Sequence, residues 1–204
     1  MKTQSIAGSA GALQVVEDMP AGTPAAVAVI CHPHPQHGGN LNNKVVHQLA
    51  KTFTALDAVC IRFNFRGVGE SEGEYDEGRG ELQDLLAVVA WAQGRWPELP
   101  LWLGGFSFGG FIALQGAQQL APQRLVTVAP AVNYFPDSSL NLCGISWLLI
   151  QGDADDIVPA KLVEGWLAGQ EVQPQLVLLE GAGHFFHGRL NDLKQAIVDS
   201  FSAD

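Results

Sequence analysis

Apolar runs of strand length alternate along this chain with amphipathic stretches of helix length. The segment Ala25–His32 is a continuous apolar run that contains Val and Ile, which is typical of a strand buried on both faces. Apolar positions then recur at helical spacing over Asn42–Leu56, and a second strand-like run follows at Ala58–Phe65. This order predicts parallel strands joined by a helical crossover.

The same alternation continues towards the C-terminus. Helices are predicted over Gly80–Trp96, Phe108–Gln119, Ala160–Ala168 and Arg189–Phe201, and strands over Leu101–Gly104, Leu125–Ala129, Ile145–Gln151 and Gln175–Glu180. Near the N-terminus, Ser5–Gly8 and Ala12–Glu17 flank a short turn and predict a hairpin. We therefore expect residues 1–204 to form one α/β domain, with a mostly parallel, twisted sheet and helices on both faces.

Composition narrows the class of partner. Hydrophobic residues make up 47% of the 204 residues and charged residues 16%, so the chain should fold into a compact core. The formal net charge of −10 argues against nucleic-acid and anionic-membrane partners, which need clustered Lys and Arg. We expect a small-molecule partner and leave open a monomer or a small homo-oligomer.

Two further features bear on where the protein works. Cys31, Cys60 and Cys143 are too few and too widely spaced for a disulfide framework, so we expect buried free thiols. The N-terminal residues lack the apolar core of a signal peptide, and no apolar run approaches the roughly 20 residues of a membrane span. These observations predict a cytoplasmic protein that does not enter a membrane.

The candidate chemistry begins at the sequence Gly105-Phe106-Ser107-Phe108-Gly109, which joins a predicted strand to a predicted helix. This is a G-x-S-x-G motif in the strand-turn-helix setting that a nucleophilic serine needs. Gly105 and Gly109 are the elbow positions, where a side chain would crowd the neighbouring chain. Ser107 is thus the candidate nucleophile.

A serine hydroxyl needs a base to take its proton and an acid to orient that base. Acid candidates follow one predicted strand, in Gly152-Asp153-Ala154-Asp155-Asp156, and base candidates follow the next strand, as His184 and His187. The carboxyl ends of parallel strands meet at one edge of a sheet, so both loops should lie beside Ser107.

In this order, the motifs resemble the α/β-hydrolase superfamily, in which G-x-S-x-G, a G-x-x-D-x-x-V-P loop and a G-x-G-H loop recur. The resemblance implies an α/β-hydrolase fold and selects Asp155 as the acid and His184 as the base, although Asp153 and Asp156 remain alternatives for the acid. The stretches around His32–His37, Arg62–Ser71 and GFSFGG resemble a bacterial subgroup of small, lid-less hydrolases related to the dienelactone hydrolase and carboxylesterase branches.

The loop His32-Pro33-His34-Pro35-Gln36-His37 takes the place of the oxyanion loop in that superfamily. Pro33 and Pro35 have no N–H, so the expected oxyanion donors are the backbone amides of His34 and Phe108. An alternative makes His32, His34 and His37 metal ligands, because H-x-H is a common ligand spacing. The two prolines already explain a rigid turn and no acidic ligand is near in sequence, so we expect no metal.

The segment Arg62–Ser71 resembles the superfamily's D-x-R-G-x-G-x-S stretch, with Asn64 where Asp is usual. We expect Arg66 to have a structural role, bonded to loop carbonyls or carboxylates. Five carboxylates crowd the loop that follows, Glu70, Glu72, Glu74, Asp76 and Glu77. They either rim the active site and repel anionic esters or form a solvated surface away from it.

The resemblance implies a serine hydrolase that cleaves small carboxylic esters or thioesters through an acyl-enzyme on Ser107, without a metal or an organic cofactor. The stretch Pro130–Gly144 is too short for a helical cap, so Tyr134 and Phe135 are the expected substrate-lining residues there. Three alternatives remain: a non-catalytic member of the fold, an acyl-transfer enzyme, and a metal-assisted hydrolase built on the HPHP loop.

Overall fold

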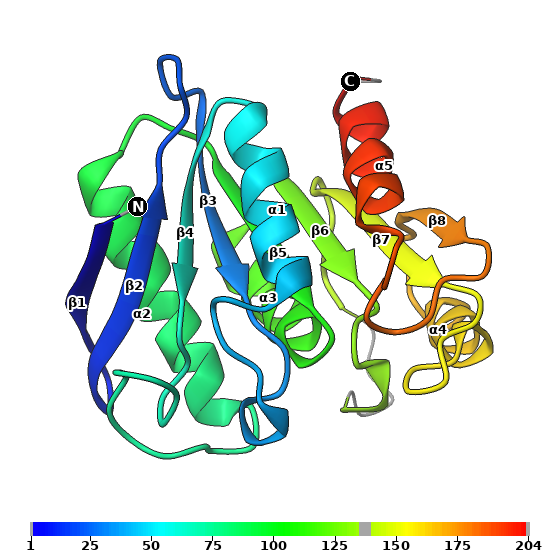
Figure 1. Cartoon of the computed structure of the whole chain (residues 1–204), viewed down its shortest axis with the longest axis horizontal. Coiled ribbons are helices and arrows are strands. Elements are labelled where there is room, and N and C mark those ends of the chain that lie inside the picture. The colour runs from blue at the N-terminus through cyan, green and yellow to red at the C-terminus, as the bar shows by residue number, and fades with distance from the viewer. Residues whose placement is uncertain (1, 135–139, 203–204) are drawn as a thin grey trace.

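The computed structural model describes residues 2–134 and 140–202, and its centre is one eight-stranded sheet (Figure 1). Its order is β1-β2-β4-β3-β5-β6-β7-β8, in which β1 and β2 run antiparallel to their neighbours and the others are parallel. The strands are β1 Lys2–Gly8, β2 Gly11–Asp18, β3 Ala26–Cys31, β4 Ala58–Phe63, β5 Leu101–Phe106, β6 Arg124–Val128, β7 Ser146–Gly152 and β8 Gln175–Leu179. The predicted mostly parallel sheet is confirmed.

Helices cover both faces of this sheet. The helices are α1 Lys44–Ala55, α2 Arg79–Arg95, α3 Phe108–Leu120, α4 Ala160–Leu167 and α5 Leu190–Ser202, with 3-10 turns η1 Pro35–His37 and η2 Val132–Tyr134. Two apolar clusters separate the layers, one between the sheet and α1 with α5, the other between the sheet and α2, α3 and α4. The predicted helices and parallel strands are present, with ends that differ by a residue or two.

Strand β3 shows why a continuous apolar run predicts a central strand. Side chains alternate between sheet faces, so Val27 and Val29 enter one cluster while Ala28 and Ile30 enter the other. All six β3 residues are fully buried, and β3 pairs in parallel with both β4 and β5. Burying each Val or Ile contributes about 1.5–3 kcal/mol, which makes this strand a main source of stability.

The edge opposite β8 is the predicted hairpin. β1 and β2 are antiparallel, and their pairing starts beside the turn, where Gly8 lies opposite Gly11. The first strand begins at Lys2, earlier than the predicted start at Ser5. Ile6, Leu13 and Val15 face the apolar cluster under α2. The hairpin thereby extends the sheet beyond β4.

The start of α2 depends on a buried carboxylate. Glu81 accepts hydrogen bonds from the backbone N–H of Gly78 at 2.7 Å and of Asp76 at 2.9 Å, which satisfies donors at the helix N-terminus. The helix ends at Arg95, just before Pro97, as the proline predicts.

Cysteine burial is predicted correctly at two positions and wrongly at the third. Cys31 and Cys60 are buried on β3 and β4, but Cys143 is exposed, and all three are free thiols. The reason is local: Leu142 fills the core position, and the chain turns away at Gly144, whose φ is 79°.

Between β6 and β7 the described residues, 129–134 and 140–145, form only the short turn η2 and loop. No cap domain is built there from described residues, as the lid-less resemblance implies. In the part of the chain that the structure describes, no helix is long and apolar enough to span a bilayer.

Candidate active site

Ser107 occupies a strained turn between β5 and α3. Its backbone has φ 56° and ψ −119°, a region that residues other than glycine rarely adopt. Two neighbouring segments hold it there, because the Ser107 N–H donates to the Val128 carbonyl at 2.9 Å and its own carbonyl accepts from Ala131 at 3.1 Å. The turn raises the hydroxyl above the carboxyl end of the sheet.

The two elbow glycines have no room for a side chain. A Cβ on Gly105 would lie 2.2 Å from the Gly109 carbonyl oxygen, and one on Gly109 would lie 2.3 Å from the carbonyl oxygen of Cys31. Both obstacles are backbone, which cannot rotate aside. The close approach of α3 to β3 and β5 therefore requires glycine at both positions.

The loops after β7 and β8 bring an acid and a base to Ser107. His184 Nε2 lies 3.0 Å from Ser107 Oγ, and His184 Nδ1 lies 2.7 Å from Asp155 Oδ2. The three side chains are nearly buried, with exposed fractions of 9% for Ser107, 4% for His184 and 5% for Asp155. With the Nδ1 proton donated to Asp155, Nε2 can accept the serine proton.

The Asp155 carboxylate is held by more than the histidine. Oδ1 accepts from the backbone N–H of Ile157 at 2.9 Å and of Val158 at 2.8 Å. Burial raises the pKa of the Asp155 carboxyl, but the hydrogen bonds from His184, Val158 and Ile157 outweigh it, so the net pKa lies below its ordinary value. Asp155 is thus set up to carry a negative charge behind the imidazole.

The other candidate residues lie elsewhere. Asp153 is exposed and accepts from the Gly181 N–H at 2.6 Å, and Asp156 is also exposed. His187 is exposed too, with its ring 5.9 Å from that of Phe185. Of the candidate acids and bases, only Asp155 and His184 are hydrogen-bonded in a chain to Ser107.

Gln151 is a site residue that the sequence analysis did not single out. It is fully buried at the end of β7, and its Nε2 donates to Asp155 Oδ2 at 3.0 Å and to the Val158 carbonyl at 2.9 Å. Its one signal in the sequence is an amide at the end of the apolar run Trp147–Ile150. A buried polar side chain there needs a partner, and the acid loop provides it.

Both predicted oxyanion residues border Ser107. Phe108 is the first residue of α3, where backbone N–H groups have no partner within the helix. His34 lines the same small cavity as Ser107 and His184, and its ring lies 5.0 Å from the ring of Phe108. Their amides remain the candidate donors for an oxyanion.

The three histidines of the HPHP loop have different surroundings. His32 is fully buried, with Nδ1 2.6 Å from the Pro33 carbonyl and Nε2 accepting from the Phe65 N–H at 3.1 Å. Desolvation lowers its pKa to about 4. His32 could ligate a metal only by giving up one of these bonds, so the geometry does not favour the metal alternative.

The ring of His34 lies among other aromatic rings. Its Nδ1 accepts from the Gln36 N–H at 3.2 Å, and its Nε2 lies 3.2 Å from the hydroxyl of Tyr75. The ring of Tyr134 lies 6.1 Å from that of His34 and 5.9 Å from that of Phe108, but Tyr134 is not among the residues that line the cavity at Ser107, so its contact with substrate stays a prediction. Phe135, the other predicted lining residue, lies outside the described residues.

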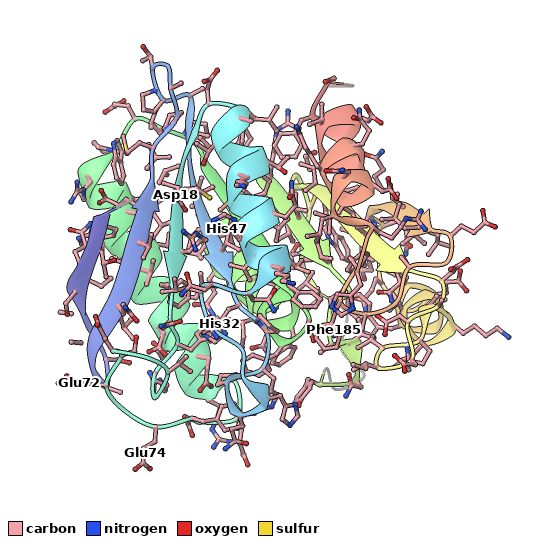
Figure 2. All side chains as sticks on the ribbon, in the orientation of Figure 1. Asp18, His32, His47, Glu72, Glu74 and Phe185 are labelled. Atoms are coloured by element: carbon pink, nitrogen blue, oxygen red, sulfur yellow. The ribbon has the colours of Figure 1, made fainter. Side chains whose placement is uncertain are left out.

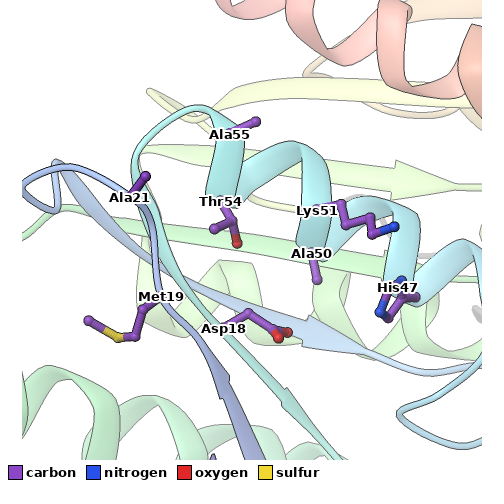
Figure 3. Close-up of a pocket in the computed structure, with 8 residues that line it drawn as sticks. All are labelled: Asp18, Met19, Ala21, His47, Ala50, Lys51, Thr54 and Ala55. Atoms are coloured by element: carbon purple, nitrogen blue, oxygen red, sulfur yellow. The ribbon is translucent and has the colours of Figure 1, made fainter. Parts of the chain in front are cut away.

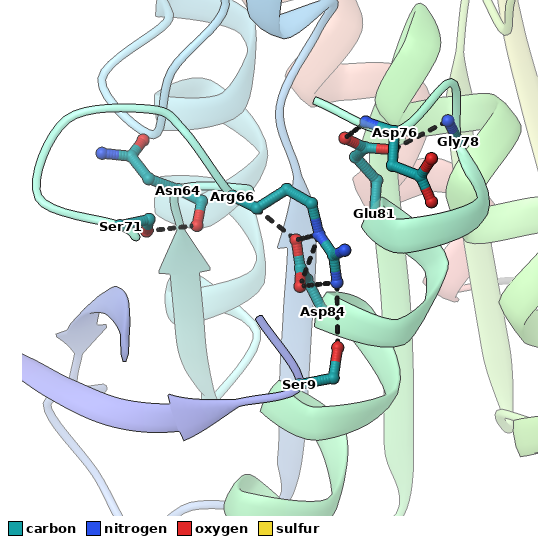
Figure 4. A network of polar contacts seen from close by, with 8 residues as sticks. All are labelled: Ser9, Asn64, Arg66, Ser71, Asp76, Gly78, Glu81 and Asp84. Carbon is teal, nitrogen blue, oxygen red and sulfur yellow. Dashed lines mark hydrogen bonds and ion pairs between the residues drawn. The ribbon is translucent and has the colours of Figure 1, made fainter. Parts of the chain in front are cut away.

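Arg66 has the predicted structural role (Figure 4). Its guanidinium donates to Asp84 at 2.7 Å and to the Ser9 hydroxyl at 2.9 Å, so it ties α2 to the loop after β4 and to the hairpin turn. Asn64 also holds loops together, since its Oδ1 accepts from the Leu41 N–H at 2.8 Å. The departure from Asp at position 64 therefore affects loop packing rather than the Ser107 site.

The cavity beside Ser107 is small, at about 120 Å³. A larger cavity of about 480 Å³ lies between β2 and α1, with Asp18, His47 and Thr54 around it (Figure 3). Among the described residues, no serine or cysteine lines that larger cavity. The chemistry assembled around Ser107 makes the smaller cavity the candidate active site.

Comparison with known proteins identifies the family of this chain. Residues 22–143 match the family Hydrolase_4, described as serine aminopeptidase, S33. An α/β serine hydrolase homologue from Coxiella burnetii superposes with a TM-score of 0.93 at 42% identity, covering 97% of this chain and 96% of the other. An α/β serine hydrolase without lid from Xanthomonas campestris gives 0.95 at 39% identity, covering 99% and 94%.

An uncharacterized protein of Rickettsia prowazekii is 36% identical over 185 residues, which cover 86% of this chain and 78% of that one. The family match spans more than half of the chain, and the two superposed structures share its architecture over nearly their whole length. This chain belongs to the serine aminopeptidase S33 family of α/β hydrolases, among its bacterial lid-less members.

Proposed function

We propose that this protein hydrolyses small carboxylic esters or thioesters through an acyl-enzyme on Ser107. The observation that carries the proposal is the unbroken hydrogen-bond chain from Ser107 Oγ through His184 to Asp155, with links of 3.0 Å and 2.7 Å. A serine held in this way loses its proton to the imidazole as it attacks a carbonyl.

The steps follow from the positions of the groups. Ser107 Oγ bonds to the carbonyl carbon while its proton passes to His184 Nε2, and Asp155 stabilises the resulting imidazolium. The N–H groups of Phe108 and His34 donate to the oxyanion, and one such preorganised donor is worth about 3 kcal/mol. His184 then protonates the leaving alcohol or thiol, and water attacks the acyl-enzyme by the same route.

The size of the cavity beside Ser107 supports small acyl groups. Its volume is about 120 Å³, and the described part of the β6–β7 connection has no cap to extend it. A ligand binds well when most of its surface is buried, so a long acyl chain would gain little here.

The family description includes aminopeptidases, and peptide cleavage is therefore a second candidate. An aminopeptidase must bind a cationic α-amine, which calls for a carboxylate in the site. Among the described residues, neither the cavity at Ser107 nor the adjoining one has Asp or Glu in its lining, and Lys44 lines the adjoining one. This charge distribution favours esters over peptides.

A fluorophosphonate probe tests the proposal directly, because it reacts with an activated serine. We expect one covalent adduct on Ser107 by mass spectrometry, and none in Ser107→Ala. Ser71→Ala is a matched control, since the Ser71 hydroxyl donates to the Asn64 carbonyl at 2.7 Å and is bonded to no histidine among the described residues. An unlabelled wild-type protein that also fails to cleave p-nitrophenyl acetate would indicate a binding protein on this fold.

A further inference from the structure

A second cavity adjoins the one at Ser107. It has a volume of about 420 Å³, and Asn43 and Phe185 line both cavities, so the two are neighbours across these side chains. The second cavity offers space next to the site for a group larger than the small cavity can hold.

The second cavity lies where the leaving group of the proposed reaction is expected. In the proposed reaction, His184 Nε2 gives its proton to the departing oxygen, so the alcohol part of the ester must leave on the His184 side. Phe185 and His187 follow His184 in the same loop, and both line the second cavity. The alcohol part is therefore the part of the substrate that enters it.

The lining of this cavity is rich in hydrogen-bond donors. Lys44 is exposed at the start of α1 and contributes an ammonium group, and His187 contributes an imidazole. Asn43 has a fixed orientation, because its Oδ1 accepts from the Val45 N–H at 2.9 Å and from the Val46 N–H at 3.4 Å. That leaves the Asn43 Nδ2 group to donate to a ligand.

Negative charge is missing from both cavities, although the chain has 21 acidic residues and a net charge of −10. No Asp or Glu is among the described residues that line either one. Two carboxylates of the acidic loop are bonded to the hairpin instead, since Glu72 accepts from the Ala12 N–H at 2.7 Å and Glu70 from the Gln14 side chain at 3.2 Å. Figure 2 shows Glu72 and Glu74 towards the β1–β2 edge, away from Phe185.

From this lining we infer that the natural substrate is an ester whose alcohol part carries an anionic group, either a carboxylate or a phosphate. Lys44, Asn43 and His187 bind this group. The inference rests on the proposed function and adds the substrate class. An ammonium, an amide and an imidazole N–H match such an anion, and no carboxylate among the described lining residues opposes it.

Three substrates with the same acyl group test the inference: the butyrate esters of γ-hydroxybutyrate, of its neutral amide, and of propanediol monophosphate. We expect kcat/KM for at least one anionic ester to exceed that for the amide by about two- to fivefold, the range of a solvent-exposed charge pair. The anionic ester with the higher kcat/KM shows whether the site prefers a carboxylate or a phosphate. The preference should shrink as salt rises from about 0.01 M to about 0.1 M, since the Debye length falls from about 30 Å to about 10 Å.

Lys44→Met should bring the ratio of anionic to amide ester close to one. Lys51→Met is the matched control, because Lys51 is on the same helix but lines the cavity beside β2, and it should keep the wild-type ratio. Cleavage of the amide ester at least as fast as both anions, or a ratio unchanged in Lys44→Met, would overturn the inference. If Ser107 takes no fluorophosphonate label and none of the three esters is cleaved, the proposed function itself fails.

Discussion

Gln151 Nε2 lies 3.0 Å from Oδ2 of Asp155, the same oxygen that faces His184 Nδ1 at 2.7 Å. The amide and the imidazole thus approach one carboxylate oxygen, while the backbone N–H groups of Ile157 and Val158 take the other. A carboxylate fixed at both oxygens cannot rotate, so the direction of the imidazole is fixed with it.

We predict that Gln151→Met lowers kcat at nearly unchanged KM, because Gln151 positions Asp155 and is fully buried beneath it. A hydrogen bond to a charged group contributes about 1.5–3 kcal/mol, so the free energy of unfolding should fall by a similar amount. Steady-state kinetics and urea unfolding of the same preparation measure both effects. A purely structural role would lower stability but leave kcat per folded molecule unchanged.

A second prediction separates the three neighbouring acids. Asp155→Asn should reduce kcat by about three to four orders of magnitude, because the amide can no longer stabilise an imidazolium. Asp156→Asn should leave kcat near wild type, since Asp156 is exposed. Asp153→Asn should lower kcat only slightly more than Asp156→Asn does, because it weakens the hydrogen bond that Asp153 accepts from the Gly181 N–H.

Thermal melts of the three variants provide the control for this comparison. If Asp153→Asn or Asp156→Asn proves more damaging than Asp155→Asn at equal stability, another carboxylate orients His184 in the working enzyme.

A third prediction concerns acid stability and His32. The His32 pKa is lowered to about 4 by burial, whereas the unfolded chain has a histidine pKa of about 6.5. The unfolded chain therefore binds the proton more readily, so stability is complete above about pH 6.5 and is lost as the pH falls towards 4. From about pH 7.5 to about pH 5 the loss from this group should be about 2 kcal/mol.

Urea unfolding at the two pH values measures that loss. His32→Gln is the comparison, because its amide oxygen can accept from the Phe65 N–H but does not titrate. The variant should be less stable at neutral pH and should lose about 2 kcal/mol less on acidification. Equal losses in the two proteins would show that His32 is not the group responsible.

A fourth prediction compares two helical glycines with different surroundings. Gly109→Ala should abolish activity and strongly destabilise the fold, because its Cβ would lie 2.3 Å from the Cys31 carbonyl oxygen. Gly165→Ala in α4 has nothing within 4 Å of the new Cβ and should stabilise the protein by about 0.5–1 kcal/mol. Melting temperatures of both variants test the contrast, and a soluble, active Gly109→Ala enzyme would contradict it.

Much of this fold could be predicted because the signals are local. The apolar run at Ala25–His32, the helical spacing within Asn42–Leu56 and the stop at Pro97 each depend on neighbouring residues. The proximity of Ser107, Asp155 and His184 also follows from local motifs, because each lies in the turn or loop that follows a parallel strand.

What the sequence could not predict depends on how individual loops turn and pack in the folded chain. The bond from Gln151 to Asp155 is visible only once β7 and the acid loop have folded. The sequence left open whether the acidic loop rims the site or lies away from it, because the bonds from Glu70 and Glu72 to the hairpin form only in the folded chain. In the sequence Cys143 lies beside an apolar run, but the turn at Gly144 places its side chain at the surface.

The last prediction concerns acyl-chain length. Each methylene that enters a dry pocket contributes up to about 0.8 kcal/mol, so kcat/KM should rise while the chain still finds wall to contact. The cavity at Ser107 holds only about 120 Å³, and its Ile157 and Phe185 walls are themselves exposed, so that gain should end early. On p-nitrophenyl esters we expect a maximum between acetate and butyrate and a clear fall by octanoate.

Because the described β6–β7 residues form no cap, the rate should also not jump when the substrate passes its micellar concentration. Initial rates across the ester series, taken below and above that concentration, measure both effects in one experiment, with Ser107→Ala subtracted as the background. A steady rise to decanoate, or activation at the micelle surface, would mean that a further wall covers the site and lengthens the acyl pocket.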